Sequence, residues 1–315
     1  MIARVQALRI PPPEVEERLP RFDGPNVLWF FGAIATASAT NALIAAVSPS
    51  ARGTWILLLG LCFAAAYTVL CVVLRASRWW VPGGLFATIV VTLVPATGVG
   101  FEKLIGVVPE STSDVSFDPF QDFKGSIFAL GLVTILVGLA VYQLVQFEFV
   151  LSVIALATVL TVLWFVPAVV DHPSSDDHAT TLLVTGALMV VIGLLLDRRG
   201  KRRAAFWWHV VGFGAVAIGL VYYVGSNRSS AAWIAMMITG VGVLLLAAPL
   251  GRSTWAVYGV AGAYAPLVHW IADGGGRWQI PLILVFISLA ILFLGIAMHV
   301  YGSAWRAQLQ QRYRL

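Results

Sequence analysis

Residues 149–170 read FVLSVIALATVLTVLWFVPAVV, a run of 22 residues without a single charged side chain. An α-helix rises about 1.5 Å per residue, so this run is long enough to cross a hydrocarbon layer about 30 Å thick. Nine further runs of 18 to 22 mostly apolar residues lie at 27–47, 54–74, 81–99, 125–145, 179–196, 204–224, 231–250, 254–271 and 281–301. Their apolar residues are continuous rather than alternating, which favours helices over the strands of a membrane barrel. The sequence therefore predicts an all-α, polytopic transmembrane helix bundle of about ten spans.

The composition places the whole chain in the membrane class. Hydrophobic residues make up 59% of the 315 residues and charged residues 11%, whereas a soluble domain carries about 25% charged residues. We expect one bundle over residues 27–301 and no soluble domain. Pro95, Pro167 and Pro266 fall inside predicted spans, where the missing backbone N–H predicts kinks.

Lysine and arginine are distributed unequally between the two sides of the predicted bundle. With the N-terminus inside, the inner segments carry 15 of the 20 basic residues, and the outer side keeps Arg52, Lys103, Lys124, Arg228 and Arg277. Cytoplasmic loops hold the excess of positive charge, so both termini are predicted to be cytoplasmic. Nearly all of the 12 tryptophans also fall near span ends, as is typical of the membrane interface. Without a transit peptide, this pattern favours a multi-pass protein of a bacterial plasma (inner) membrane.

The two terminal segments are predicted to lie in the cytoplasm. In the tail of residues 1–26, Ile2, Val5 and Leu8 recur every three residues. This spacing permits a short interfacial helix, and a disordered tail is the alternative. Residues 302–315 carry apolar side chains every four residues among basic ones, which predicts an amphipathic helix.

An outer segment at residues 109–124 has two distinct faces. Its phenylalanines recur at steps of three and its aspartates at steps of four: Phe117, Phe120 and Phe123, and Asp114, Asp118 and Asp122. This spacing predicts an amphipathic helix on the outer surface. A solvated acidic face is preferred to a cation site, because the glycine-turned loop of a calcium hand is absent from the segment.

The outer joint at 171–178 is the best metal candidate. Imidazole and carboxylate groups suit zinc or a similar divalent ion, and the residues that would hold it are His172, Asp176, Asp177 and His178. The spacing matches no known zinc motif, so an ordinary exposed loop is preferred. No cofactor is predicted, because the chain contains no recognisable cofactor motif.

Ionisable groups inside a membrane span usually mark a functional path, because they are costly there unless paired or hydrated. His269 and Asp273 are four residues apart near the outer end of the ninth span and could form a paired polar site. Thr40 and Asn41 in the first span could line the same kind of pocket or bond across helices. His209 and His299 lie beside arginine-rich joints, which an interfacial position explains.

The densest basic joint lies between the sixth and seventh spans. Arg198, Arg199, Lys201, Arg202 and Arg203 follow Asp197 there. These residues adjoin spans rather than a soluble face, so the predicted partner is the bilayer with its anionic headgroups on the inner face, and not nucleic acid. A role as a plain topology anchor is preferred to a specific lipid site. A membrane-protein partner is a further hypothesis.

Part of the chain resembles a known group of bacterial membrane proteins. Residues 257–264 read VYGVAGAY and are followed by Trp270, by PL at 281–282 and by LGI at 294–296, while 81–85 read VPGGL. These features resemble the proteins grouped as domain of unknown function 2157. Many such proteins carry a sizeable cytoplasmic N-terminal region, whereas the predicted tail before the first span covers only residues 1–26. The resemblance implies an uncharacterised membrane bundle and supplies no catalytic residue.

Two classes of function follow from the layout. Ten spans in about 300 residues with short loops are typical of a small-solute transporter, whose two five-span halves would be inverted relative to each other because five is odd. The halves show no clear internal likeness, so the transporter ranks only narrowly above a non-transporting scaffold or sensor that binds lipid or another membrane protein. A membrane enzyme ranks third, because no nucleophile and base pair can be named and only His269 with Asp273 approaches a cluster of His, Asp or Glu at one depth.

Overall fold

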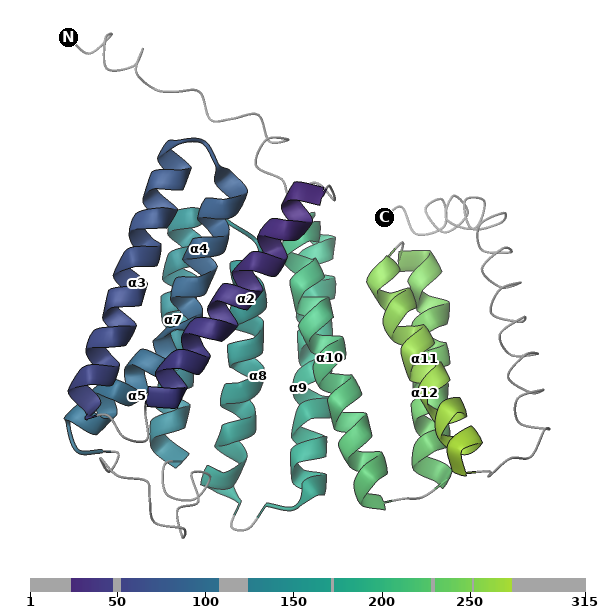
Figure 1. Ribbon diagram of the computed structural model, residues 1–315. Coiled ribbons are helices and arrows are strands. Elements are labelled where there is room, and N and C mark those ends of the chain that lie inside the picture. Colours follow the sequence, from purple (N-terminus) through teal and green to yellow (C-terminus); the bar gives the residue numbers. More distant parts are fainter. Residues whose placement is uncertain are drawn as a thin grey trace. The chain divides into compact units, whose positions relative to one another are not determined.

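A computed structural model describes residues 24–47, 52–107, 124–170, 173–227, 230–250 and 252–273, and every element in these ranges is an α-helix (Figure 1). The helices are α2 (Gly24–Val47), α3 (Gly53–Ala76), α4 (Trp80–Thr92), α5 (Val94–Leu104), α7 (Lys124–Val145), α8 (Val150–Val169), α9 (Ser175–Arg198), α10 (Arg202–Asn227), α11 (Ser230–Leu250) and α12 (Ser253–Asp273). The predicted all-α class is confirmed.

Seven helical segments are long and apolar enough to cross a membrane, which is the character of a multi-pass membrane protein. They comprise α2, α3, α4 together with α5, α7, α8, α9 and α10, and they correspond to the first seven predicted spans. The eighth predicted span coincides with α11, whose apolar part Ala231–Ala247 is shorter, and the ninth coincides with α12. The tenth, at 281–301, lies outside the described residues.

The three predicted segments between and beyond the spans also fall largely outside the described residues. Only residues 24–26 of the N-terminal tail, which begin α2, and Lys124 of the outer segment, which begins α7, are described. The predicted helices at 109–123 and 302–315 therefore stay predictions.

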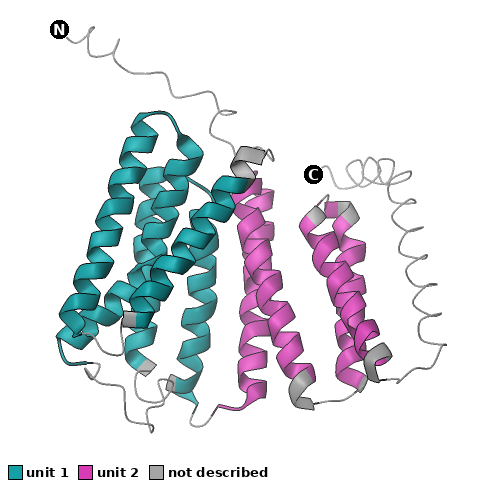
Figure 2. Cartoon of the chain, viewed as in Figure 1, with its two compact units in different colours: residues 1–171 teal, residues 172–315 magenta. Residues whose placement is uncertain are grey.

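The chain divides into two compact units, residues 1–171 and 172–315 (Figure 2). The division falls between the fifth and the sixth predicted spans. Each unit is described by itself below.

Helix α4 lies at the centre of unit 1. It contacts α2, α3, α7 and α8, and most of its residues are buried. Pro95 explains why α4 does not run on into α5 past Leu93, because proline has no N–H for the carbonyl of Val91, and its ring crowds that carbonyl. The kink predicted at Pro95 is therefore a break between two helices.

Arg75 joins three helices of unit 1 at one end. Its Nη1 donates to the carbonyl of Val145, the last residue of α7, at 2.9 Å, and its guanidinium lies 4.8 Å from the ring centroid of Trp80 at the start of α4. A cation at the C-terminus of a helix satisfies an orphan carbonyl and complements the helix dipole. This contact fixes the end of α7 against α3 and α4.

Unit 2 contains two closely packed helix pairs, α9 with α10 and α11 with α12. The seam of the first pair is made of buried small residues at intervals of seven, Ala179, Gly186 and Gly193 on α9 and Ala205, Gly212 and Gly219 on α10. A Cβ on Gly186 would lie 2.6 Å from the carbonyl oxygen of Gly212. In the second pair, a Cβ on Gly259 would lie 2.5 Å from the backbone nitrogen of Leu244. Both pairs therefore have backbones in direct contact, as small residues permit between membrane helices.

Candidate ionisable site in the second unit

Asp197 occupies the last turn of α9, where the chain reverses into α10. Gly200 adopts a φ of 76°, and this left-handed conformation lets its N–H donate to the carbonyl of Asp197 at 2.9 Å. Lys201 N–H donates to the carbonyl of Leu196 at 2.9 Å. These two bonds close α9 as a glycine C-cap does, so α10 can begin at Arg202 and return along α9.

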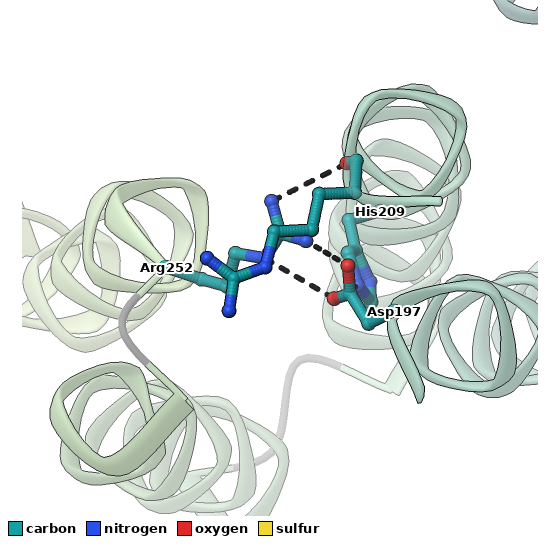
Figure 3. Close-up of polar contacts among 4 residues, drawn as sticks. Asp197, His209 and Arg252 are labelled. Atoms are coloured by element: carbon teal, nitrogen blue, oxygen red, sulfur yellow. Dashed lines mark hydrogen bonds and ion pairs between the residues drawn. The ribbon is translucent and has the colours of Figure 1, made fainter. Parts of the chain in front are cut away.

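The carboxylate of Asp197 receives groups from two other segments (Figure 3). Its Oδ2 accepts from Nε of Arg252 at 3.1 Å and lies 3.2 Å from Nε2 of His209, while its Oδ1 pairs with Nη2 of Arg252. The guanidinium and the carboxylate therefore form an ion pair that includes one charge-assisted hydrogen bond, which is stronger than a bond between neutral groups. We call Asp197, His209 and Arg252 the Asp197 cluster.

Arg252 also holds the reversing chain itself. It immediately precedes α12, and its Nη1 donates to the carbonyl of Arg202 at 3.4 Å. One side chain from the second helix pair thus contacts the end of α9 and the start of α10. The Asp197 cluster links the two helix pairs of unit 2.

The cluster is shielded from solvent to different degrees. His209 is 0% exposed, and the side chains of Asp197 and Arg252 are 19% and 17% exposed. Burial lowers the pKa of the Arg252 guanidinium from its ordinary value, yet a guanidinium beside a carboxylate stays protonated. The paired charges of Asp197 and Arg252 compensate each other, so a neutral His209 leaves the cluster without net charge.

Only one of the two ring nitrogens of His209 faces the carboxylate of Asp197. A carboxylate only accepts hydrogen bonds, so we assign the proton of the neutral ring to Nε2, which faces Asp197. Among the described residues, Nδ1 has no hydrogen-bond partner. The ring lies against Gly193 of α9, where an added Cβ would come within 2.6 Å of Cε1. The position thus holds an imidazole only because the facing residue is glycine.

Aromatic rings enclose the cluster on the side of α12. The ring centroid of His209 lies 5.5 Å from that of Trp255, and Phe213 lies 5.0 Å from Trp255 at 84°. Tyr258 stacks on Phe213 and donates its hydroxyl to the carbonyl of Val210 at 3.0 Å. This apolar wall keeps water from the histidine and strengthens the electrostatic interactions beside it.

The ion pair between Asp197 and Arg252 holds the two helix pairs of unit 2 together at this end. A second proton on His209 would add an uncompensated positive charge beside Arg252. The described residues contain no group of three or more His, Cys, Asp or Glu side chains placed to hold a metal ion.

Thr40 and Asn41 bond within unit 1. Thr40 is 5% exposed and its hydroxyl donates to the carbonyl of Thr36 at 2.8 Å, so the 2.7 Å bond to the Tyr67 hydroxyl is donated by Tyr67. Asn41 Nδ2 donates to the carbonyl of Ala37 at 2.9 Å. The contact of Thr40 with Tyr67 joins α2 to α3, the interhelical use weighed for these residues.

His269 and Asp273 lie on α12 of unit 2. The ring of His269 stacks on Trp233 of α11, with centroids 3.9 Å apart and planes 13° apart. Asp273 is the last residue of α12, and its side chain is not among those described. The predicted pairing of these two residues stays a prediction, as does a pocket shared with Thr40 and Asn41.

The residues of the metal candidate begin α9. Ser174 caps the helix by accepting from the N–H of Asp177, whose carboxylate receives the N–H of Ser174 at 2.8 Å. Nδ1 of His178 lies 2.9 Å from the carbonyl oxygen of Ser174. Asp176 belongs to the same first turn and is exposed, and His172 lies outside the described residues. The capping box gives Asp177 a structural role in helix formation, and the metal site stays a prediction.

The five basic residues of the α9–α10 turn are all exposed: Arg198, Arg199, Lys201, Arg202 and Arg203. They surround Asp197 in the sequence, but the carboxylate faces inward to Arg252 and His209. The acidic residue of this joint is thereby separated from its basic neighbours.

Unit 1 contains a buried acid that the sequence did not mark. Glu102, near the end of α5, is 8% exposed and accepts from the hydroxyl of Ser126 on α7 at 2.5 Å. Lys103 is 4% exposed, although the charge pattern assigns it only to the outer side. Both residues end a short helix that packs against α3 and α7.

The Asp197 cluster itself was missed by the sequence reasoning. The charge pattern put Asp197 in a basic joint and His209 at the interface, while the structure encloses the histidine ring completely in protein. The small residues at intervals of seven on α9 and α10 could have indicated the cluster. They show which faces of the two helices meet, and His209 borders the face of α10.

No protein-family model, no curated protein and no solved structure matches this chain. These comparisons lend no support to the resemblance to domain of unknown function 2157, which stays a prediction.

Proposed function

We propose that this chain is a ten-span transporter of a small solute in a bacterial plasma membrane, with both termini in the cytoplasm. The observation that carries the proposal is the Asp197 cluster. Ionisable side chains that are shielded from water and paired with one another gather at functional sites more often than elsewhere. Here three of them converge where two helix pairs meet.

The cluster has the parts of a gate. Each helix pair of unit 2 has backbones in direct contact, so each pair moves as one body, whereas Asp197 and Arg252 hold the two pairs together through side chains. A charged solute, or a proton on Asp197, would compete with Arg252 for its partner. Loss of that ion pair would let the helix pairs separate at this end, as domain rocking in transporters requires.

The division of the chain agrees with a transporter layout. The boundary at 171/172 leaves five predicted spans on each side, and an odd number of spans gives consecutive units opposite orientations in the membrane. The helices pair differently in the two units, since α4 is central in unit 1 while unit 2 is built of two pairs. The proposal therefore rests on the cluster and not on an internal repeat.

Transport currents from proteoliposomes on a solid-supported membrane test this proposal. A panel of amino acids, organic acids, sugars and organic cations is applied to the wild type, to Asp197→Asn and to Arg252→Gln. Asp176→Asn is the matched control, because it removes an exposed carboxylate from the other end of the same helix. We expect at least one solute to evoke a current that falls about tenfold or more in the two cluster variants and persists in the control.

Absence of a current for every solute in folded wild-type protein would contradict the proposal. A current that Asp197→Asn leaves intact would remove the cluster from it. The polar pair on α12 is tested in the same assay, since His269→Ala and Asp273→Asn are expected to impair uptake without loss of folded protein if these residues line the path.

A non-transporting scaffold or sensor is the second candidate. It is favoured by the polar side chains of α2, whose hydrogen bonds are made within unit 1. Tyr67 of α3 bonds to Thr40 of α2, and Thr40 and Asn41 donate to carbonyls of their own helix, which is how polar residues act in a rigid bundle. This candidate predicts no solute current together with a membrane partner that copurifies in constant proportion. Chemical cross-linking in native membranes before extraction measures that proportion.

A further inference from the structure

The α9–α10 turn exposes five basic side chains, and within the described part of unit 2 none of them forms an ion pair. Arg198, Arg199, Lys201, Arg202 and Arg203 are exposed, whereas the acid in their midst, Asp197, is turned inward and paired with Arg252. Had Asp197 pointed outward, it would have formed local pairs with its neighbours and reduced the charge of the turn. Within the described residues of unit 2, the turn is therefore a patch of five positive charges without an acidic partner.

The remaining acids of residues 173–273 are distant from this patch. They are Asp176 and Asp177 at the start of α9 and Asp273 at the end of α12. Each is separated from the turn by about the length of its helix, roughly 30 Å at 1.5 Å per residue. Charges at that separation are screened at physiological salt.

The turn is also held in a fixed shape. Gly200 closes it through the backbone bonds to Asp197 and Leu196, and Arg252 binds both the carboxylate of Asp197 and the carbonyl of Arg202. The backbone that carries the five basic residues is therefore set by the fold. A preset surface loses less conformational entropy on binding than a mobile loop.

The position of the turn identifies what covers it. It joins α9 and α10, two helices long and apolar enough to cross a membrane, so it lies at a membrane surface. Apolar side chains flank it directly, with Leu195 51% and Phe206 37% exposed, and Trp207 and Trp208 follow half-buried. The basic residues would therefore meet the lipid headgroups, and the aromatic residues that follow them would meet the boundary with the acyl chains.

We infer that the α9–α10 turn binds the headgroups of anionic phospholipids. Arginine matches the oxygens of a phosphate with two parallel N–H groups, and five charges at one turn can engage more than one headgroup. Each basic residue near an anionic surface contributes about a fivefold preference at low salt. This inference is independent of the proposed transport.

Electron spin resonance of spin-labelled lipids tests the inference on the full chain. The protein is placed in phosphatidylcholine bilayers with a trace of spin-labelled phosphatidylglycerol or phosphatidylcholine, and the fraction of lipid immobilised at the protein gives the preference. We expect the wild type to prefer phosphatidylglycerol and the triple variant R199Q/K201Q/R203Q to lose at least about threefold of that preference.

The matched control removes three basic residues that the charge pattern assigns to the other side, R52Q/R228Q/R277Q. It is expected to retain the preference, because these residues do not belong to the turn. An equal loss in both triple variants, or no loss in either, would overturn the inference. The variant R199K/R203K keeps both charges and should keep most of the preference.

Two measurements on the wild type test the same inference if the triple variant does not fold. The preference should fall as salt rises from 0.1 to 1 M, because the Debye length shrinks from about 10 Å to about 3 Å, and a preference unaffected by salt would overturn the inference. An excess of glycerol phosphate should leave the preference intact. If it abolishes the preference, the turn binds soluble phosphate esters instead of bilayer headgroups.

Discussion

At the scale of single residues, Asp197 is the position where side chains from three segments of unit 2 meet. Its carboxylate binds Arg252 through both oxygens and faces His209, and so connects α9, α10 and the start of α12. Removing one partner of a shielded pair leaves the other charge without compensation, and this loss is greater than the value of the pair itself.

Asp197→Asn is therefore expected to destabilise the protein. Both charged side chains remain about one-fifth exposed, so water offsets part of the loss, and the expected cost is about 1–3 kcal/mol instead of the larger cost of a fully buried pair. Thermal unfolding in detergent measures it, with Asp176→Asn as the control of equal charge. The double variant Asp197→Asn/Arg252→Gln should be less destabilised than the sum of the single variants, because neither charge is then left alone. Strict additivity would contradict the pairing.

Gly193 offers a second test at this scale. A methyl group there would lie 2.6 Å from Cε1 and 2.7 Å from Nδ1 of His209, so Gly193→Ala forces the enclosed ring to move and is expected to cost about 1–3 kcal/mol. Gly214→Ala is the matched control, since a Cβ on Gly214 meets nothing within 4 Å. It should be neutral or stabilising by up to about 1 kcal/mol, because alanine is the better helix former.

Gly193→Ala combined with His209→Ala shows whether the His209 ring causes the strain. His209→Ala removes the ring that the new methyl group would strike, so Gly193→Ala should cost little in that background. An unchanged cost would mean that the clash is with another group.

At the scale of helices, the N-terminus of α9 illustrates how local sequence sets an element. Ser174 and Asp177 satisfy each other's backbone N–H groups and begin the helix at Ser175. Ser174→Ala removes the cap and is expected to lower stability by about 1 kcal/mol, the usual cost of losing a serine N-cap. Ser175→Ala is the control, because it changes the neighbouring serine and leaves the cap. Equal unfolding temperatures for the two variants would show that the cap contributes nothing.

Helix positions could be predicted from the sequence because hydrocarbon thickness sets them. The nine predicted spans within the described part of the chain end within five residues of the observed helices, and Pro95 interrupts the third where its missing N–H predicts a kink. The Asp197 cluster could not be predicted in this way. His209 is 12 and Arg252 is 55 residues from Asp197 in the chain, and their meeting depends on the rotation of each helix about its axis, which hydropathy does not record.

At the scale of the whole molecule, the number of spans before the unit boundary decides which side the basic turn faces. With a cytoplasmic N-terminus and five spans in residues 1–171, α9 begins outside and ends inside. The α9–α10 turn then meets the inner leaflet, where anionic lipids attract basic residues. One fewer or one more span before Ser174 would place the turn on the outer side and remove this physical basis.

Single cysteines and a membrane-impermeant maleimide test this topology. Cys62 and Cys71 are first replaced by alanine, and one cysteine is introduced by Val5→Cys, Ser113→Cys, Ser175→Cys or Gln310→Cys. In intact bacterial cells we expect labelling of the variants at 113 and 175 and none at 5 and 310, and labelling of all four after lysis. Lysed cells are the control for accessibility of each thiol. Because each span reverses the side, labelling at 310 without labelling at 5 would mean an odd number of spans and would refute ten, whereas protection of 175 would refute the five spans that place the basic turn in the cytoplasm.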